Sequence, residues 1–163
     1  MITIVAAIGA KFELAVDDKM LWNLPDDYNH FKAITKDHPV IMGRKSVDTM
    51  TDILEDRTAI IITRNKDHKK EGVIIENSIE KAISKARKIN ENVFIIGGGQ
   101  IYNLGIKYAD QIELTRVHGT FPKANVFFPQ FSIQYWKLIS SKEHPINENH
   151  AYSFTYETWK RIQ

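Results

Sequence analysis

The stretch Val93-Phe94-Ile95-Ile96-Gly97-Gly98-Gly99-Gln100-Ile101-Tyr102 places three glycines between an apolar run and a helical pattern. The run predicts a buried strand, so the segment is a strand, a tight turn and a helix start. Glycines in such a turn let backbone amides approach an anion at the helix N-terminus. Tyr102 stands where a GxGxxG fingerprint needs glycine, so a turn without a ligand is an equally good interpretation.

Similar apolar runs rich in Ile and Val predict other buried strands at 2–8, 40–42, 59–63, 73–75, 93–96 and 112–117. Helical patterns alternate with them, opening near Pro25, after Gly43, at 79–89 behind a Ser78 cap, and after Gly99. Segments 136–141 and 152–159 have only polar turn residues between them and predict an antiparallel hairpin. We therefore expect one α/β domain spanning 1–163. It has a mostly parallel central sheet with helices on both faces and a C-terminal antiparallel edge hairpin.

Bulk composition narrows the function classes. The 163 residues carry a net charge of +2, which predicts neither nucleic acid nor membrane binding. The chain has no cysteine, which excludes disulfides and fits a cytoplasmic location, and its six histidines lack metal-binding spacing. The N-terminal apolar run lacks a basic leader and is far shorter than the roughly 20 residues of a membrane span.

Asp27 falls on the apolar face of the helix that opens at Pro25, beside Tyr28 and Phe31, while Asp26 is expected to point to water. No Lys or Arg shares that face, so a buried Asp27 needs a partner, and that partner is a ligand in one interpretation. In the other, Asp27 is simply a first-turn acid favoured by the helix dipole.

Two more predicted strand ends carry basic turns, Gly43-Arg44-Lys45-Ser46 and Thr63-Arg64-Asn65-Lys66. The carboxyl ends of parallel strands share one rim, so these turns and the glycine turn favour a dinucleotide. Arg64 further suggests a 2′-phosphate, hence a phosphorylated nicotinamide cofactor. The cluster of Lys66, Lys69 and Lys70 is read as an ordinary solvated face.

Several motifs also stand in the order and spacing of one known family. They are Ile4-Val5-Ala6-Ala7, Met20-Leu21-Trp22-Asn23-Leu24-Pro25, Phe31-Lys32, Pro39-Val40-Ile41-Met42-Gly43-Arg44-Lys45-Ser46, Arg57, Ile96-Gly97-Gly98-Gly99-Gln100-Ile101-Tyr102, Leu114-Thr115 and Phe128-Pro129. On these residues, nearly the whole chain resembles a bacterial, chromosomal-type dihydrofolate reductase.

The resemblance implies a role for each matching substrate residue. Asp27 is the catalytic residue, which binds the pterin's 2-amino group and ring N3, with help from Thr115 at the amino group. Arg57 holds the α-carboxylate of the substrate's glutamate tail. The implied substrate-binding set is Val5, Ala6, Asp27, Tyr28, Phe31, Met50, Leu54, Arg57, Ile96, Tyr102 and Thr115.

The resemblance also implies NADPH as the cofactor. The implied contacts are Ala7, Leu14, Ala15 and Met20 at the nicotinamide, Gly43, Arg44, Lys45, Ser46, Thr63 and Arg64 around the phosphates, and Gly97, Gly98, Gly99, Gln100 and Ile101 over the pyrophosphate. In this family the Gly97–Gly98 peptide is cis, an uncommon linkage. No metal ligand is implied.

The implied reaction is hydride transfer to C6 of 7,8-dihydrofolate, with a water delivering a proton to N5 while Asp27 holds the opposite edge of the ring. Met20 lies on a loop that gates solvent and cofactor. The family further implies a cytoplasmic monomer that binds dihydrofolate and antifolate inhibitors, without nucleic acid or membrane partners.

Departures from the family pattern cluster in loops. Ala15 and Leu21 replace a usual glycine and proline in the lid, and Ala124-Asn125-Val126 replaces a Gly-Asp sequence that steadies it. Asn125 keeps an amide oxygen that accepts a hydrogen bond but lacks the charge. Segment 51–56 lacks the usual proline and glycine, its Glu55 and Asp56 are expected to compete for Arg57, and Tyr28 narrows the pocket where leucine is common.

Two other functions fit the same sequence. One is a reductase of riboflavin synthesis with the same architecture and cofactor, which Asp27, Phe31 and Arg57 together disfavour. The other is a sensor or decoy that binds NADP without catalysis, which the loop departures favour and the intact acid disfavours.

Overall fold

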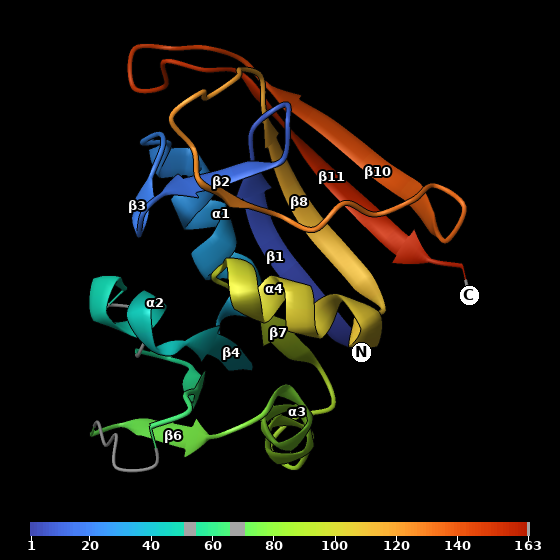
Figure 1. Cartoon of the computed structure of the whole chain (residues 1–163). Helices are drawn as coiled ribbons and strands as arrows, with labels where there is room; N and C mark the ends of the chain where they lie inside the picture. The colour runs from blue at the N-terminus through green and yellow to red at the C-terminus, as the bar shows by residue number, and fades with distance from the viewer. Residues whose placement is uncertain (51–54, 66–70, 163) are drawn as a thin grey trace.

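Strand β1 lies in the middle of an eight-stranded sheet whose strand order is β10-β11-β8-β1-β7-β4-β5-β6 (Figure 1). The computed structural model describes residues 1–50, 55–65 and 71–162. The strands are β1 (Ile2–Ile8), β4 (Pro39–Gly43), β5 (Thr58–Ile62), β6 (Val73–Glu76), β7 (Val93–Ile95), β8 (Gln111–Val117), β10 (Trp136–His144) and β11 (Phe154–Arg161). Each strand predicted from an apolar run is present within a residue or two.

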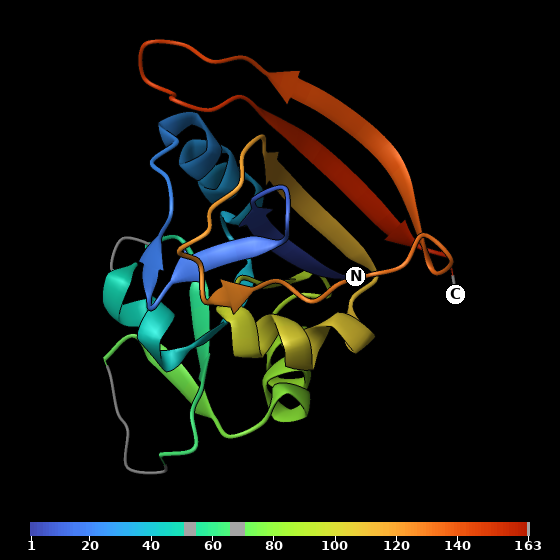
Figure 2. The ribbon, with the colours of Figure 1, turned by 45° about the horizontal axis from the view of Figure 1, so that its top comes forward.

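The pairing confirms the predicted fold class. Strands β8, β1, β7, β4, β5 and β6 are parallel to their neighbours, whereas β11 is antiparallel to β8 and to β10. The two C-terminal strands form the long outer hairpin that both views show at one side of the sheet (Figures 1 and 2). The predicted edge hairpin is therefore confirmed, and β10 is its outermost strand.

Helices cover both faces of the sheet. They are α1 (Pro25–Thr35), α2 (Arg44–Thr49), α3 (Ile79–Arg87) and α4 (Gly99–Gly105), followed by the 3-10 turn η2 (Ile106–Tyr108). Side chains of β1 alternate between the faces, so Ile4 packs in one core cluster with Ile79 of α3, and Val5 packs in another with Val47 of α2. None of the helices in the described ranges has the length and apolar content of a membrane span.

The predicted cap of α3 is confirmed, because the Ser78 hydroxyl accepts a hydrogen bond from the Lys81 backbone N–H at 3.1 Å. A capping side chain of this kind satisfies one of the free donors in the first turn of a helix. The pattern of buried Ile79, Ala82, Ile83 and Ala86 then turns the apolar face of α3 toward the sheet.

A second, three-stranded sheet was not predicted. It has the order β3-β2-β9 and consists of β2 (Glu13–Val16), β3 (Lys19–Met20) and β9 (Val126–Phe127). The buried Glu13 carboxylate connects the start of β2 to the segment before β9, because it accepts hydrogen bonds from the backbone N–H groups of Lys11 and Phe121, each at 2.6 Å. These strands, of four, two and two residues, are too short to stand out from a loop in the sequence.

Candidate active site

A cavity of about 470 Å³ opens between the large sheet, the small sheet and α1. Such a volume suits one or two small ligands. Its walls come from β1, the 14–20 segment, α1, α2, the turn after β7 and β8. Of the sequence-predicted residues, the lining includes Val5, Ala6, Ala7, Leu14, Ala15, Met20, Asp27, Tyr28, Phe31, Lys45, Ser46, Met50, Ile96, Gly98, Gly99, Tyr102 and Thr115.

Asp27 is buried in this cavity, as the helical pattern predicted. The Thr115 hydroxyl donates a hydrogen bond to Asp27 Oδ1 at 2.6 Å, and no basic side chain in the described ranges forms an ion pair with the carboxylate. Burial raises the pKa of Asp27 from 3.8 to about 6, and the Thr115 hydrogen bond and the more distant His144 and His150 oppose that rise. The protein itself therefore offsets little of the hydration that the Asp27 carboxylate loses in this apolar cavity.

Aromatic and aliphatic side chains surround this acid. Tyr28 and Phe31 stack with ring centroids 6.0 Å apart along α1. The buried Tyr102 hydroxyl donates to the carbonyl oxygens of Val5 (2.7 Å) and Ile96 (3.0 Å), which ties β1 to the turn after β7. Burial, and then the charge of Asp27, raise the pKa of Tyr102, so it remains a protonated donor. These contacts fix the wall opposite α1.

Arg57 does not line the cavity. Its guanidinium donates to Thr35 Oγ1 (2.9 Å), to the carbonyl oxygen of Glu55 (2.7 Å) and to the carbonyl oxygen of Lys32. The contact with Glu55 is thus to the main chain rather than to its carboxylate. Leu54 and the rest of segment 51–54 lie outside the described residues, as do Lys66, Lys69 and Lys70.

Some of the predicted cofactor residues line the cavity, and the others lie outside its lining. Parallel neighbours β7, β4 and β5 bring the glycine turn and the two basic turns to one rim, as predicted. The peptide between Gly97 and Gly98 is cis, as the resemblance implied, and Gly97 accepts a hydrogen bond from Gly43 N at 2.8 Å. The predicted residues that do not line the cavity are Gly43, Arg44, Thr63, Arg64, Gly97, Gln100 and Ile101. Arg44 and Arg64 are exposed nearby, whereas the Ile101 side chain belongs to the core.

Asn125 is hydrogen-bonded to the lid segment, residues 13–20, and the sequence indicated only one of the two contacts. Asn125 Oδ1 accepts a hydrogen bond from Asp17 N at 2.7 Å, as predicted, and Asn125 Nδ2 also donates to Asp17 Oδ1 at 2.9 Å. Ala15 pairs with Met20 on one side and with Val126 on the other. The small sheet therefore holds the lid against the cavity without the family's acidic side chain.

Two residues near the cavity have contacts or surroundings that the sequence did not indicate. Trp22 received no role, yet it lines the cavity, and its buried Nε1 has no hydrogen-bond partner in the described part of the chain. Asp26 is exposed, as expected, and its carboxylate also lies 2.8 Å from His144 Nε2 and 3.8 Å from His150 Nε2. The sequence did not indicate these two contacts, because His144 at the end of β10 and His150 in the following turn lie more than a hundred residues later.

Comparisons with known proteins point to one family. Residues 1–161 match the family model described as dihydrofolate reductase. The dihydrofolate reductase of Bacillus subtilis (strain 168) is 30% identical over 161 residues, covering 99% of this chain and 95% of that protein. The Staphylococcus haemolyticus dihydrofolate reductase is 32% identical over 162 residues, covering 99% and 96%. A solved structure of the Enterococcus faecalis enzyme complexed with NADP(H) and RAB-propyl superposes with a TM-score of 0.92 at 28% identity, covering 100% of this chain and 97% of that one.

Proposed function

Since this chain belongs to the dihydrofolate reductase family, we propose that its cavity binds 7,8-dihydrofolate with Asp27 as the anchor of the pterin ring. The enzyme is an NADPH-dependent oxidoreductase that reduces dihydrofolate to 5,6,7,8-tetrahydrofolate. One observation carries the assignment of the site. It is the buried Asp27 carboxylate, for which Thr115 provides the one side-chain hydrogen bond found among the described residues.

Asp27 suits the pterin edge because of what its two oxygens can accept. The 2-amino group and ring N3–H of a pterin present two parallel donors, and a carboxylate accepts such a pair through charge-assisted bonds. Oδ1 already accepts from Thr115, whose hydroxyl oxygen in turn can accept from the 2-amino group. The donors then favour the ionised carboxylate, against the effect of burial on its pKa.

Asp27 cannot reach N5 while it holds the opposite edge of the ring, so we assign proton delivery to a water molecule. The carboxylate anion raises the basicity of N5 from across the ring. The Trp22 indole N–H, buried in the cavity wall, is a donor available to position that water. The protein thus contributes position, charge and exclusion of solvent, with Met20 in the lid as the gate.

The other end of the cavity has the groups that a dinucleotide requires. Lys45, Ser46, Gly98 and Gly99 line it, and the backbone at Gly98 is open to close approach. A Cβ added at Gly98 would meet no atom closer than Ser46 Oγ at 3.9 Å, so this space is free for a phosphate. NADPH supplies the hydride when bound there. We assign Arg44, Thr63 and Arg64 to its phosphates and the remaining glycine-turn residues to backbone contacts.

Folate analogues that present the same paired donors should compete for Asp27, so antifolates are the expected inhibitors. We also infer a monomer that works in the cytoplasm, without nucleic acid or membrane partners, from what the family resemblance implies.

The decisive experiment follows NADPH absorbance with dihydrofolate for the wild type and Asp27→Asn. We expect turnover in the wild type and a loss of about 10²-fold or more in the variant, because the neutral amide replaces the anion. Tight NADPH binding without turnover by the wild type would indicate a sensor. Turnover of only the riboflavin precursor would indicate the alternative reductase.

A substrate that lacks the glutamate tail tests whether Arg57 binds that tail. If Arg57 holds the tail, Arg57→Lys raises the KM for dihydrofolate and leaves the KM for 7,8-dihydropteroate unchanged, since Lys lacks the planar pair of donors. An equal rise for both substrates would mean that Arg57 acts only by tying Lys32 and Thr35 to Glu55.

A comparison of NADPH with NADH, which lacks the 2′-phosphate, tests whether Arg64 binds that phosphate. Arg64→Ala should raise the KM for NADPH and leave the KM for NADH unchanged, because only NADPH carries that group. Arg87→Ala, a change to another arginine in the last turn of α3, is the matched control. Equal effects on both cofactors would remove Arg64 from the phosphate site.

A further inference from the structure

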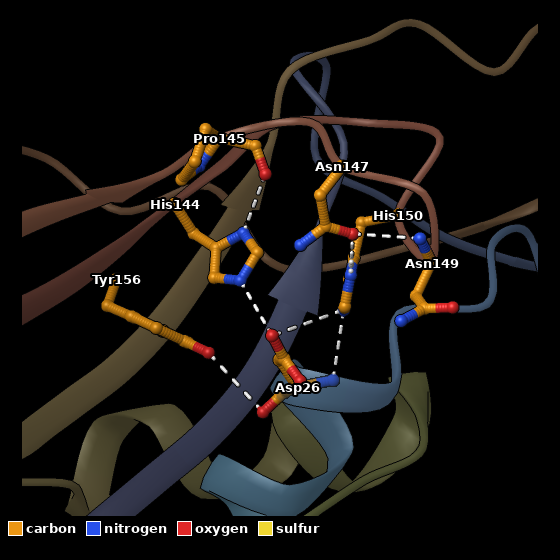
Figure 3. Close-up of polar contacts among 7 residues, drawn as sticks. All are labelled: Asp26, His144, Pro145, Asn147, Asn149, His150 and Tyr156. Atoms are coloured by element: carbon orange, nitrogen blue, oxygen red, sulfur yellow. Dashed lines mark hydrogen bonds and ion pairs between the residues drawn. The ribbon is translucent and has the colours of Figure 1, made fainter.

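Asp26, His144 and His150 form a cluster that the reductase chemistry does not use (Figure 3). Asp26 is in the first turn of α1, His144 ends β10, and His150 lies in the turn that leads to β11. This turn lies beside the N-terminal end of α1 (Figure 2). The carboxylate oxygen and the two ring nitrogens that face it all lie within 4.8 Å of one another.

Both histidines are oriented in the same way. His144 Nδ1 lies 2.8 Å from the carbonyl oxygen of Pro145, and His150 Nδ1 lies 2.8 Å from Asn147 Oδ1. Each Nδ1 therefore carries a proton that it donates to an oxygen, and each Nε2 is turned toward Asp26 (Figure 3). Metal-binding histidines show this arrangement, in which a hydrogen bond from one ring nitrogen fixes the tautomer and aims the other nitrogen at the ion.

The three ligand atoms are already grouped within 4.8 Å, and they must draw closer together to accommodate an ion. Ligand atoms about 2.0–2.1 Å from a tetrahedral zinc ion lie roughly 3.3 Å from one another. The Nε2 to Asp26 Oδ2 separations here are 2.8 Å for His144 and 3.8 Å for His150, one shorter and one longer than that value. Rotation of the half-exposed Asp26 side chain can even out these two distances, and the partly exposed His144 must also move toward the buried His150.

We propose that Asp26 Oδ2, His144 Nε2 and His150 Nε2 form a binding site for a divalent transition-metal ion such as Zn²⁺. Two imidazoles and one carboxylate are a ligand set that suits zinc, cobalt and nickel and discriminates against magnesium and calcium, which prefer oxygen ligands. Three protein ligands leave at least one position for water or an external group.

The bound ion replaces two weaker contacts. His150 Nε2 accepts a hydrogen bond from Asp26 N at 3.0 Å, and an ion takes that lone pair instead. His144 Nε2 donates to Asp26 Oδ2, and an ion takes the place of that proton, which is released to solvent. The freed Asp26 N–H is a first-turn donor of α1, which water can satisfy because Asp26 is exposed. The ion thus joins the hairpin turn to α1 by coordinate bonds.

The test titrates chelator-treated, full-length protein with Zn²⁺ by calorimetry and with Co²⁺ by visible absorption, for the wild type, His144→Gln and His118→Gln. His118 is the matched control, because it lies on a neighbouring segment with both ring nitrogens hydrogen-bonded to Ser153 and Thr155. We expect one ion per wild-type chain, at least about tenfold weaker binding by His144→Gln, and wild-type binding by His118→Gln. Thermal unfolding without metal confirms that each variant is folded.

Histidine ring ¹⁵N spectra of the wild type provide a readout that needs no variant. Zn²⁺ should shift the Nε2 resonances of His144 and His150 and leave those of His118 in place. If His144→Gln binds Zn²⁺ as tightly as the wild type, or the ring signals of His144 and His150 do not respond, the cluster is only a hydrogen-bonded support for α1 and the proposal is wrong. Because no readout here is turnover, this outcome is independent of the reductase assignment.

Discussion

Replacing Thr115 by Val tests whether Asp27 is held as an isolated acid. Valine has nearly the shape of threonine but lacks the hydroxyl that donates to Asp27 Oδ1 at 2.6 Å. A hydrogen bond to a charged group contributes about 1.5–3 kcal/mol and one to a neutral group about 0.5–1.5 kcal/mol. Losing the Thr115 bond therefore disfavours the ionised carboxylate by roughly 1–1.5 kcal/mol relative to the neutral acid.

That difference corresponds to a rise of about one in the pKa of Asp27, since one pKa unit is worth about 1.4 kcal/mol. The direction follows from the protein's own balance, in which burial raises the Asp27 pKa to about 6 and Thr115 opposes the rise. No described basic side chain is paired with Asp27 to buffer the change.

The assay is a ¹³C NMR titration of labelled aspartate and glutamate carboxyl carbons in ligand-free protein, with a chelator present to keep the Asp26 cluster free of metal. The matched control is Thr158→Val, because the Thr158 hydroxyl donates to Glu113 Oε2 at 2.9 Å in a strand pair. Burial raises the pKa of Glu113 and Thr158 opposes it, so the control should raise the Glu113 pKa and leave that of Asp27 unchanged.

An Asp27 pKa that stays constant or falls in Thr115→Val would refute the reasoning. It would mean that another group, absent from the contacts described above, compensates the carboxylate. A rise in both variants would mean that loss of either hydroxyl perturbs the whole sheet rather than one acid.

Two further predictions concern the same cavity and its lid. Asp27→Asn should stabilise the ligand-free protein at neutral pH by up to about 3 kcal/mol, which is the cost of a pKa raised from 3.8 to about 6. The unfolded state loses the Asp27 proton at a lower pH than the folded state, so the free energy of unfolding of the wild type should decrease as the pH rises from 3.8 to about 6, and more than that of the variant. Urea unfolding that gave the same dependence on pH for both proteins would contradict this prediction. Asn125→Asp sets a second carboxylate against Asp17, so amide exchange in the 13–20 segment should rise about two- to fivefold and return toward the wild-type rate in added salt. An amide exchange rate that does not change with added salt would show that repulsion between Asp17 and the introduced carboxylate is not what loosens this segment.

Long apolar runs made most of the fold predictable. In β1, all residues from Ile2 to Ala6 are buried, and only a strand covered on both faces has that pattern. The position of Asp27 was equally readable, because helical periodicity placed it with Tyr28 and Phe31 and the structure confirms a buried acid beside them. Both are local properties of the sequence.

Features that depend on distant residues were not readable. Asp26 is exposed as expected, but its contact with His144 was not indicated, because His144 lies 118 positions away and no local pattern predicts which part of the hairpin packs over α1. The small sheet escaped prediction for the same reason, since β2 pairs with β9 more than a hundred residues later. Arg57 matches the family motif, yet its donors to Thr35, Glu55 and Lys32 are visible only once α1 is folded against it.

At Asp27, the stability of the ligand-free protein conflicts with ligand binding. A helix of this amphipathic pattern would be more stable with an apolar residue at that position, because the ionised side chain loses hydration on folding. Thr115, brought opposite by the pairing of β8 with β1 at Ala7, returns only part of that loss. Under the proposed function, the pterin donates two hydrogen bonds to Asp27 and returns the rest of that loss. The unfavourable burial of Asp27 in the ligand-free protein then becomes part of the affinity for the substrate.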